Sequence, residues 1–230
     1  MLIEWPIARV AALKSLTLMS PLADRHNTLH KITPTFRLKT LTITLGSSSP
    51  ALFEQLLASS SQTLRSLYLS LLASSPSYAG LVSALPLVLP TLIHLSLQHR
   101  PSPALLATLK HCHSLQSLTL HSSVPLAECL DHLPGRSLRQ LDLQFDYNLE
   151  QVVAILRARI VPGGPLGGVE VIRIPRATKS MFVLCGLSSF LSECVERNVR
   201  LEIDEGVSNL RLGGTLHARR GREVGVDQAS

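Results

Sequence analysis

The chain has 230 residues, which is enough for one large domain or one solenoid. It is 45% hydrophobic but only 4% aromatic, and its surplus of leucine argues against the varied core of an ordinary globular domain. The formal net charge of +6 is a modest excess of basic residues.

The cysteines and the N-terminal residues indicate in which cellular compartment the chain is expected to fold. Four cysteines lack any paired spacing: Cys112, Cys129, Cys185 and Cys194. No Asn-x-Ser/Thr glycosylation sequon is present, so both features favour a reducing compartment, the cytoplasm or the nucleus, and predict free thiols. The start of the chain contains Glu4 and Pro6, which makes it a poor signal peptide.

A phrase of the form Leu-x-x-Leu-x-Leu recurs along the chain. Its copies begin at Leu13, Leu38, Leu64, Leu92, Leu115, Leu138 and, in weakened form, Val169. A period of about 20–50 residues is typical of a solenoid. Alternate residues of a strand face opposite sides, so the last two apolar positions of each phrase point into a core, and each interval has room for a helix before the next parallel strand. The sequence therefore predicts an α/β solenoid of stacked repeats, about seven to eight in number, over residues 13–203.

Residues 1–12 precede the first phrase and are predicted to form a short lead-in helix around Pro6–Ala12. Solenoids usually need polar caps at both ends, and this segment leaves little room for one. Such a start is expected of a fragment of a longer protein, or of a chain that pairs with a partner.

Helical periodicity fills most of the intervals between phrases, most clearly over 126–133, 149–160 and 184–194. Ser-Pro pairs stand where several of these helices are predicted to begin: Ser49-Pro50, Ser75-Pro76 and Ser102-Pro103. Serine is a favoured N-cap and proline a favoured first helical residue. The same pairs fit proline-directed phosphorylation, but their recurrence at one structural offset favours capping.

Residues 66–99 contain no Lys, Arg, Asp or Glu, which raises the alternative of a membrane span. Pro86, Pro90 and His94 argue against it, and Leu92–Leu97 is the fourth phrase in register. The segment 81–97 is instead predicted to be a buried helix followed by its strand.

Glycines at 163–168 have the spacing of a phosphate loop, but Val169 stands where its lysine should be, so a simple loop is the better prediction. After a worn repeat at Val199–Ile203, residues 204–230 carry Arg219, Arg220 and Arg222 with few apolar residues. This end is predicted to finish the worn repeat and form a basic disordered tail.

The repeated phrase and its period resemble the leucine-rich-repeat family over roughly residues 13–203. The irregular period and the Ser-rich, Leu-rich wording are similar to the repeat region of F-box proteins of the fungal kind. The resemblance implies a horseshoe with parallel strands on its concave face and helices on its convex face. In that family the repeats capture a substrate, while an upstream F-box docks on a ubiquitin-ligase adaptor.

Two departures from the family stand out. No F-box precedes Leu13, which puts ligase docking in doubt. The usual Asn three residues after the last Leu of each phrase is missing, and those places include Arg100 and Ser123. The Asn ladder that satisfies turn backbones must therefore be replaced or lost.

Binding chemistry is expected on the concave sheet, from side chains between the leucines. The early strands offer mainly Ser and Thr, and because Thr is also a good strand former, a structural role is the simpler explanation there. Tyrosine is enriched at binding hot spots. The candidate partner-binding residues are Tyr68, His94, Gln98, His121, Gln140, Asp142, Gln144 and Arg173.

Lys14, Lys39 and Arg65 hold the same place in three successive phrases, so they should stack along one basic edge. Stacked like charges repel unless an acidic group faces them. A solvated edge is the simpler interpretation, and an acidic partner is the alternative. Nucleic acid is disfavoured, because interleaved aromatics and recognised motifs are absent from the sequence.

Catalysis and metal binding find little support, and no cofactor is predicted. His111, Cys112 and His113 are adjacent and lack metal-finger spacing. Asp142 and His121 could form a dyad on neighbouring strands, but no nucleophile motif accompanies them. The chain is predicted not to be an enzyme.

Two functional hypotheses remain. The first is a protein–protein interaction module, with substrate recognition in an F-box-type ubiquitin ligase and ligase subunits as partners. The second is a basic solenoid that binds an acidic surface, either nucleic acid or anionic lipid.

Overall fold

The fold is described by a computed structural model, which covers residues 13–18, 37–44, 50–70, 77–135, 137–144, 147–175 and 186–204. The predicted lead-in helix, the basic tail and Cys185 lie outside these residues. So do Ser49 and the Ser75-Pro76 pair.

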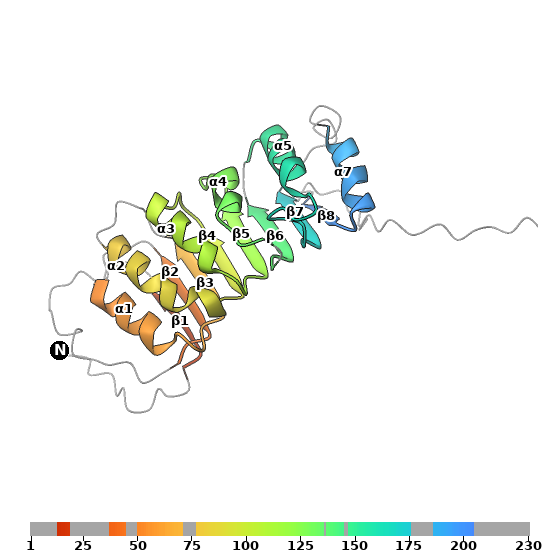
Figure 1. The fold of residues 1–230 in the computed structure, drawn as a ribbon. Coiled ribbons are helices and arrows are strands. Elements are labelled where there is room, and N and C mark those ends of the chain that lie inside the picture. The colour runs from red at the N-terminus through yellow and green to blue at the C-terminus, as the bar shows by residue number, and fades with distance from the viewer. Residues whose placement is uncertain are drawn as a thin grey trace, which may run out of the picture.

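An eight-stranded parallel sheet runs through the described residues, with its strands side by side in sequence order (Figure 1). The strands are β1 (Ser15–Leu18), β2 (Thr40–Thr44), β3 (Ser66–Ser70), β4 (His94–Leu97), β5 (Ser117–His121), β6 (Gln140–Gln144), β7 (Val171–Pro175) and β8 (Arg200–Asp204). Each predicted phrase supplies one strand, and the worn repeat supplies the eighth. The α/β prediction is confirmed, and the arrangement is solenoid-like.

Helices connect the strands and lie against one face of the sheet (Figure 1). They are α1 (Pro50–Ser59), α2 (Ser77–Ala84), α3 (Pro103–Thr108), α4 (Leu126–Asp131), α5 (Leu149–Arg159) and α7 (Leu187–Glu196). Three 3-10 turns, η3 (Leu85–Leu87), η4 (Leu89–Thr91) and η5 (Leu109–His111), complete the same layer. We call the sheet face that points away from these helices the open face.

The core is a row of leucines sandwiched between sheet and helices. Leu67, Leu118 and Leu141 are register partners in one row and are fully buried. The corresponding Leu16 on β1 and Leu201 on β8 are only partly buried, because a terminal strand has a neighbour on one side. At roughly 1.5–3 kcal/mol for each buried leucine, this row and its helix partners are the main source of stability.

The segment 81–97 corrects one prediction. In place of a single buried helix, the chain forms the eight-residue α2, then η3 and η4, and only then β4. Pro86 and Pro90 sit in the first turns of η3 and η4, where their missing N–H groups prevent a continuous α-helix. Among the described residues, no helix is long and apolar enough to cross a membrane.

A side-chain hydroxyl stands in for the usual Asn at the turn after β5, and other hydroxyls bond neighbouring repeats elsewhere. The hydroxyl of Ser123 donates to the carbonyl of Gln98 at 2.8 Å, and that of Thr44 donates to Leu18 at 2.9 Å. Thr91 Oγ1 donates to the Leu64 carbonyl at 3.2 Å. Ser and Thr hydroxyls therefore bond neighbouring repeats to each other, and Ser123 does so at the place of a usual Asn.

The capping prediction is confirmed at the described pair. Ser102 is the N-cap of α3, its hydroxyl accepts from the Leu105 amide at 3.2 Å, and Pro103 is the first helical residue. The glycines after α5 form a tight turn: a Cβ on Gly164 would lie 2.6 Å from the Arg159 carbonyl oxygen, and Gly163 has φ +83°. Chain geometry thus explains glycine at both positions.

Candidate interaction face

The open face carries two rows of side chains that continue across all eight strands, and a shorter third row that includes His121 and Gln144. The first row contains Ser15, Thr40, Ser66, His94, Ser117, Gln140, Val171 and Arg200. The second contains Thr17, Thr42, Tyr68, Ser96, Thr119, Asp142, Arg173 and Glu202. Neighbouring members of a row are about 4.8 Å apart, so partners across the strands can touch.

Strands β1 to β4 give the face a neutral, small-residue part. Tyr68 stands out there, with its side chain 40% exposed between Thr42 and Ser96. Ser96 is only 5% exposed, so the face is closely packed on that side of the tyrosine. Tyr68 therefore offers an aromatic ring and a hydroxyl above a rigid hydroxyl-lined surface.

The middle of the face is built from imidazole and amide groups. His94 is exposed at the start of β4, and Gln98, just past β4, is half-buried. His121 faces Gln144 across β5 and β6. Burial lowers the pKa of His121, the positive charge of His99 lowers it further, and a hydrogen bond with Gln144 opposes both.

The side chain of Tyr147 contacts the backbone of this region. The hydroxyl of Tyr147 donates to the backbone carbonyl of His121 and to that of Val124. Burial raises the pKa of Tyr147, so its hydroxyl keeps its proton and remains a donor at neutral pH. The hydrogen bond from Tyr147 thus holds the backbone of His121 in place.

The last three strands carry a linked set of charges. Gln140 Nε2 donates to both carboxylate oxygens of Asp142, at 2.9 and 3.2 Å. Arg173 reaches Asp142 on one side, with Nη1 to Oδ1 at 3.4 Å, and Glu202 on the other, with Nε to Oε2 at 2.6 Å. Arg200 closes the series with Nε to Glu202 Oε1 at 2.9 Å. We call these five side chains the acid–base ladder.

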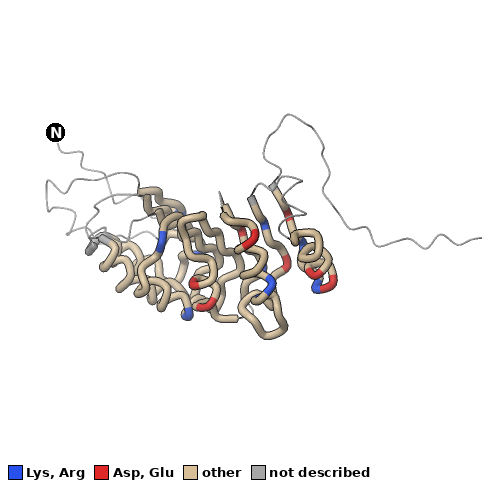
Figure 2. Tube along the Cα trace, turned by 90° about the horizontal axis from the view of Figure 1, so that it is seen from above, with Lys and Arg blue, Asp and Glu red and all other residues tan. Residues whose placement is uncertain are grey.

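The ladder is nearly self-neutralising. Two carboxylates alternate with two guanidinium groups, and the hydrogen bond to Glu202 is the main cause that raises the pKa of Arg173. Figure 2 shows acidic and basic residues interleaved in the C-terminal half and sparse in the N-terminal half. This part of the face thus offers directional hydrogen bonds with little net charge.

Sequence reasoning found Gln140, Asp142 and Arg173 but missed Arg200 and Glu202. The signal was present, because Val199-Arg-Leu-Glu-Ile203 alternates apolar and polar residues as the earlier phrases do. Register alone places Glu202 beside Arg173 and completes the ladder.

The alternative catalytic and metal interpretations gain nothing from the geometry. Register places Asp142 opposite Thr119, and Asp142 is hydrogen-bonded within the ladder. Burial raises the pKa of the Cys112 thiol to about 12, so it stays protonated at neutral pH. No group of three or more His, Cys, Asp or Glu side chains within the described ranges could hold a metal ion. Cys112, Cys129 and Cys194 are buried free thiols, as predicted.

The backbone pairing places Lys14, Lys39 and Arg65 in one column, and beyond Arg65 the column is no longer continuously basic. The carbonyl of Lys14 accepts from Lys39 and Thr40, that of Lys39 accepts from Arg65 and Ser66, and the pattern repeats onward. The column at the amino-terminal edge of the strands is Lys14, Lys39, Arg65, Ile93, Gln116, Arg139 and Glu170. Arg139 was missed, although it holds the same place in its phrase as Arg65.

Comparison with known proteins does not assign the chain to a family. No protein-family model matches the chain, and no curated protein is similar to it in sequence.

Proposed function

We propose that this chain is a leucine-rich-repeat protein whose open face recognises a protein partner. Under this proposal the open face is the concave face of a horseshoe. The observation that carries it is the register: eight strands present two unbroken rows of side chains, and the exposed ones are varied donors and acceptors.

The area of the open face is smaller than the area that a stable complex buries on each partner. Eight strands span about 34 Å, and three alternate positions along a strand span about 13 Å. The flat area is then about 450 Å², whereas a stable complex buries about 800 Å² on each partner. A partner should therefore also contact the rims of the sheet.

The chemistry of the face favours a protein over a polyanion. Tyr68 supplies an exposed aromatic anchor, and tyrosines often carry a large share of binding energy. The acid–base ladder pairs its own charges, so it does not generate a strong field of one sign. Affinity should then depend on shape and hydrogen bonds, and only weakly on salt.

We further propose that the partner is a substrate delivered to an F-box-type ubiquitin ligase. What supports this is the resemblance of the repeats to the substrate-binding region of those proteins. The test is affinity purification of the tagged chain with mass spectrometry. Ligase subunits enriched together with a candidate substrate would support the proposal, and a partner set without ligase subunits would remove the ligase part.

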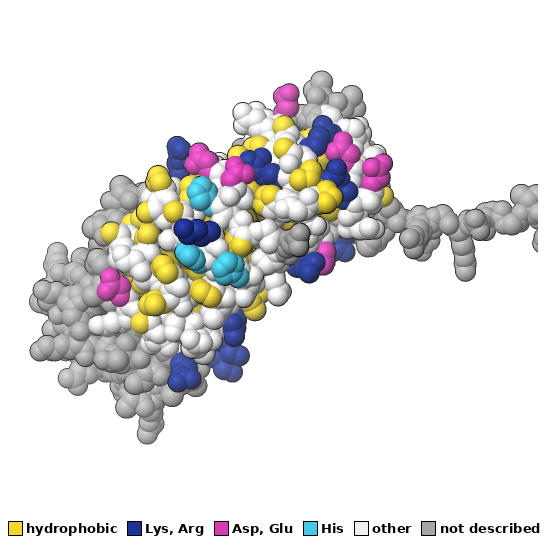
Figure 3. All heavy atoms as spheres, in the orientation of Figure 1, with side chains coloured by type: hydrophobic (Ala, Val, Ile, Leu, Met, Phe, Trp, Pro, Cys, Tyr) yellow, Lys and Arg dark blue, Asp and Glu magenta, His cyan; other side chains and the backbone are white. Residues whose placement is uncertain are grey.

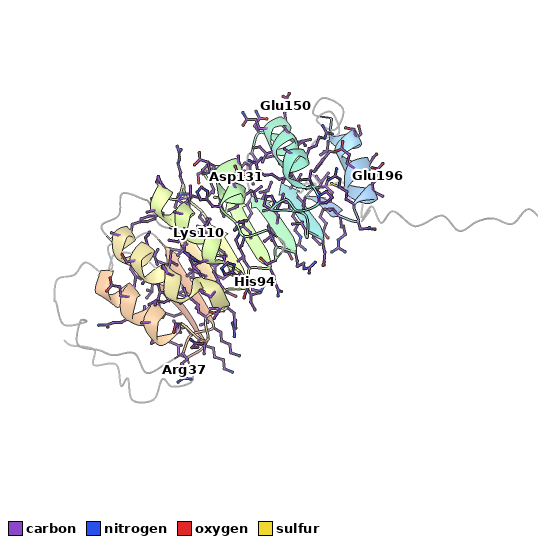
Figure 4. All side chains as sticks on the ribbon, in the orientation of Figure 1. Arg37, His94, Lys110, Asp131, Glu150 and Glu196 are labelled. Atoms are coloured by element: carbon purple, nitrogen blue, oxygen red, sulfur yellow. The ribbon has the colours of Figure 1, made fainter. Side chains whose placement is uncertain are left out.

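The same purification tests the face. Tyr68→Ala and Asp142→Asn should each reduce recovery of the partner, and affinity for it by on the order of 1–3 kcal/mol. Lys110→Ala is the matched control, because Lys110 is exposed on the helix side, as labelled in Figure 4. Equal recovery with all three variants would contradict recognition by the open face.

A further inference from the structure

We infer that the amino-terminal edge of the sheet holds a second binding site, a groove that takes an extended acidic peptide segment. It goes beyond the proposed function, because it lies at the start of the strands and shares none of the residues assigned to the open face. Either site can therefore fail without the other.

The groove is a concave feature of about 420 Å³. That volume is within the range of roughly 300–1,000 Å³ typical of ligand pockets. Arg65 and Arg139 stand at its two ends, and the uncharged Ile93 and Gln116 lie between them in the same column. His113, Ser114 and Ser137 complete the lining and add polar donors.

Both arginines are held in place by the next repeat. Arg65 Nη1 donates to the carbonyl of Thr91 at 2.9 Å, and Arg139 Nη1 donates to the carbonyl of Gly168 at 3.3 Å. Thr91 and Gly168 hold equivalent places, each directly before the first apolar residue of its phrase. A guanidinium has five N–H donors, so each anchored arginine keeps donors for a carboxylate and loses little freedom on binding.

Exposed positive charge is concentrated at the Arg65 end of this edge. Lys14, Arg37, Lys39 and Arg65 are exposed, and within the described residues every ion pair involves Arg100 or residues after it. Figure 3 shows basic side chains along the lower border of the molecule, where Figure 4 labels Arg37. At the other end, Arg139 is paired with Glu170 at 3.1 Å, with both side chains more than half exposed. The groove thus favours anions, most strongly at the Arg65 end.

The spacing selects the kind of anion. Arg65 and Arg139 are three strands apart, about 14 Å at about 4.8 Å per strand. An extended peptide advances about 3.3 Å per residue, so two acidic side chains four positions apart span the same distance. Single-stranded nucleic acid binds through a series of aromatic platforms, whereas the lining of the groove contains no Phe, Tyr or Trp and only the single imidazole of His113. A lipid surface is flat and would not enter a groove, so an acidic peptide fits best.

The experiment measures binding of a short fluorescent peptide with two glutamates four positions apart and Gly or Ser elsewhere. Fluorescence anisotropy with the full chain at low salt should show binding. Arg65→Gln and Arg139→Gln should each weaken it at least about fivefold, because each removes a forked charge-assisted contact. Lys110→Gln, which removes the same charge from the helix side, should change it less than about twofold.

One further protein variant and one further peptide keep the outcome decisive. Arg65→Lys retains the positive charge but loses the forked guanidinium donors, so its loss of peptide affinity should be smaller than that of Arg65→Gln. Residual binding by this variant would also show that the fold is intact. A peptide with the glutamates two positions apart should bind several-fold more weakly, because it reaches only one arginine. No detectable binding of the first peptide at about 1 mM, or equal binding by all variants, would overturn the proposal.

The remaining anions are also outcomes of this test. Oligothymidylate and phosphatidylserine vesicles are titrated in parallel with the peptide. If either binds more tightly than the peptide and loses affinity in Arg65→Gln, the edge is a general polyanion surface, and the peptide assignment is wrong.

Discussion

The two halves of the open face share one backbone arrangement but differ in the chemistry of their side chains. On β1 to β4 the second row of the open face is Thr17, Thr42, Tyr68 and Ser96, without a charge. On β6 to β8 the same row is Asp142, Arg173 and Glu202, joined by side-chain contacts from strand to strand. Identical spacing therefore produces a neutral surface with one aromatic anchor in the first half and a polar lattice in the second.

The comparison separates what the repeats share from what they vary. The buried leucines are nearly the same in both halves, because each repeat must cover the next. The open row is free of that demand, so its composition can differ between halves without changing the fold. Substitutions can then be matched, with the same change made at the same row position in each half.

The largest effect is expected in the shared core. Leu118→Asp on β5 would bury an unpaired charge at a fully buried position between the two halves. It should lower the free energy of unfolding by more than about 4 kcal/mol and unfold repeats on both sides. Circular dichroism during urea titration measures this, with Thr42→Asp on the open face as the control. A transition unchanged from wild type would show that Leu118 is not buried.

The next effect distinguishes the halves directly. Asp142→Lys places a cation against Arg173 and removes the acceptor of Gln140, so it should lower stability by on the order of 1–2 kcal/mol. Thr42→Lys, at the same row position in the first half, should change it by less than about 0.5 kcal/mol. Urea midpoints measure both, and equal losses would mean that the ladder has no special role.

A smaller effect is expected from coupling within the ladder. Arg173 and Glu202 are partly exposed, so their interaction energy in a double-mutant cycle with alanine should be about 0.2–1 kcal/mol. It should shrink in 1 M NaCl because salt screens exposed charges. The register pair Thr42 and Tyr68 provides the uncharged cycle, whose coupling should not depend on salt. A salt-independent Arg173–Glu202 term would contradict an electrostatic ladder.

The smallest effect is a pH dependence centred on His121. Its pKa is lower in the folded chain than in the unfolded one, mainly because of burial. As the pH falls through the unfolded value of about 6.5, the unfolded state takes up the proton first, so stability decreases. Above that pH both states are neutral and the contribution vanishes.

The pH effect is measured as thermal midpoints at pH 7.5 and 5.5. His121→Gln should lose less stability than wild type over this interval, because the titrating group is gone. His111→Gln, on the helix side, is the matched substitution. A steeper loss in His121→Gln would give the opposite sign and refute the assignment.

The strands could be predicted because their signal is local and repeated. Seven phrases predicted seven strands, and the Ser102-Pro103 cap followed from two neighbouring residues. The break between α2 and β4 could have been anticipated from Pro86 and Pro90, yet the apolar run masked it. Hydrophobicity specifies burial, whereas the missing proline N–H groups decide which helix type can form.

The sequence predicted which residues lie on the open face, but it did not predict which of their side chains contact each other. Phrase offsets put Tyr68, Asp142 and Arg173 on the open face, but Glu202 became part of the ladder only through the register of a degenerate repeat. Phrase spacing gives Arg65 and Arg139 equivalent places, but their hydrogen bonds to carbonyls of the following repeat depend on turn geometry. Contacts between repeats therefore needed the structure.

The central proposal is that partners meet the open face, and site-specific photo-crosslinking in cells tests it most directly. A benzoyl-phenylalanine would replace Tyr68 or Thr119 on the open face, and Lys110 or Glu196 on the helix side (Figure 4). The account predicts a shared covalent adduct from Tyr68 and Thr119 after irradiation, and little adduct from Lys110 and Glu196. Adducts that form chiefly from the helix-side positions would contradict it.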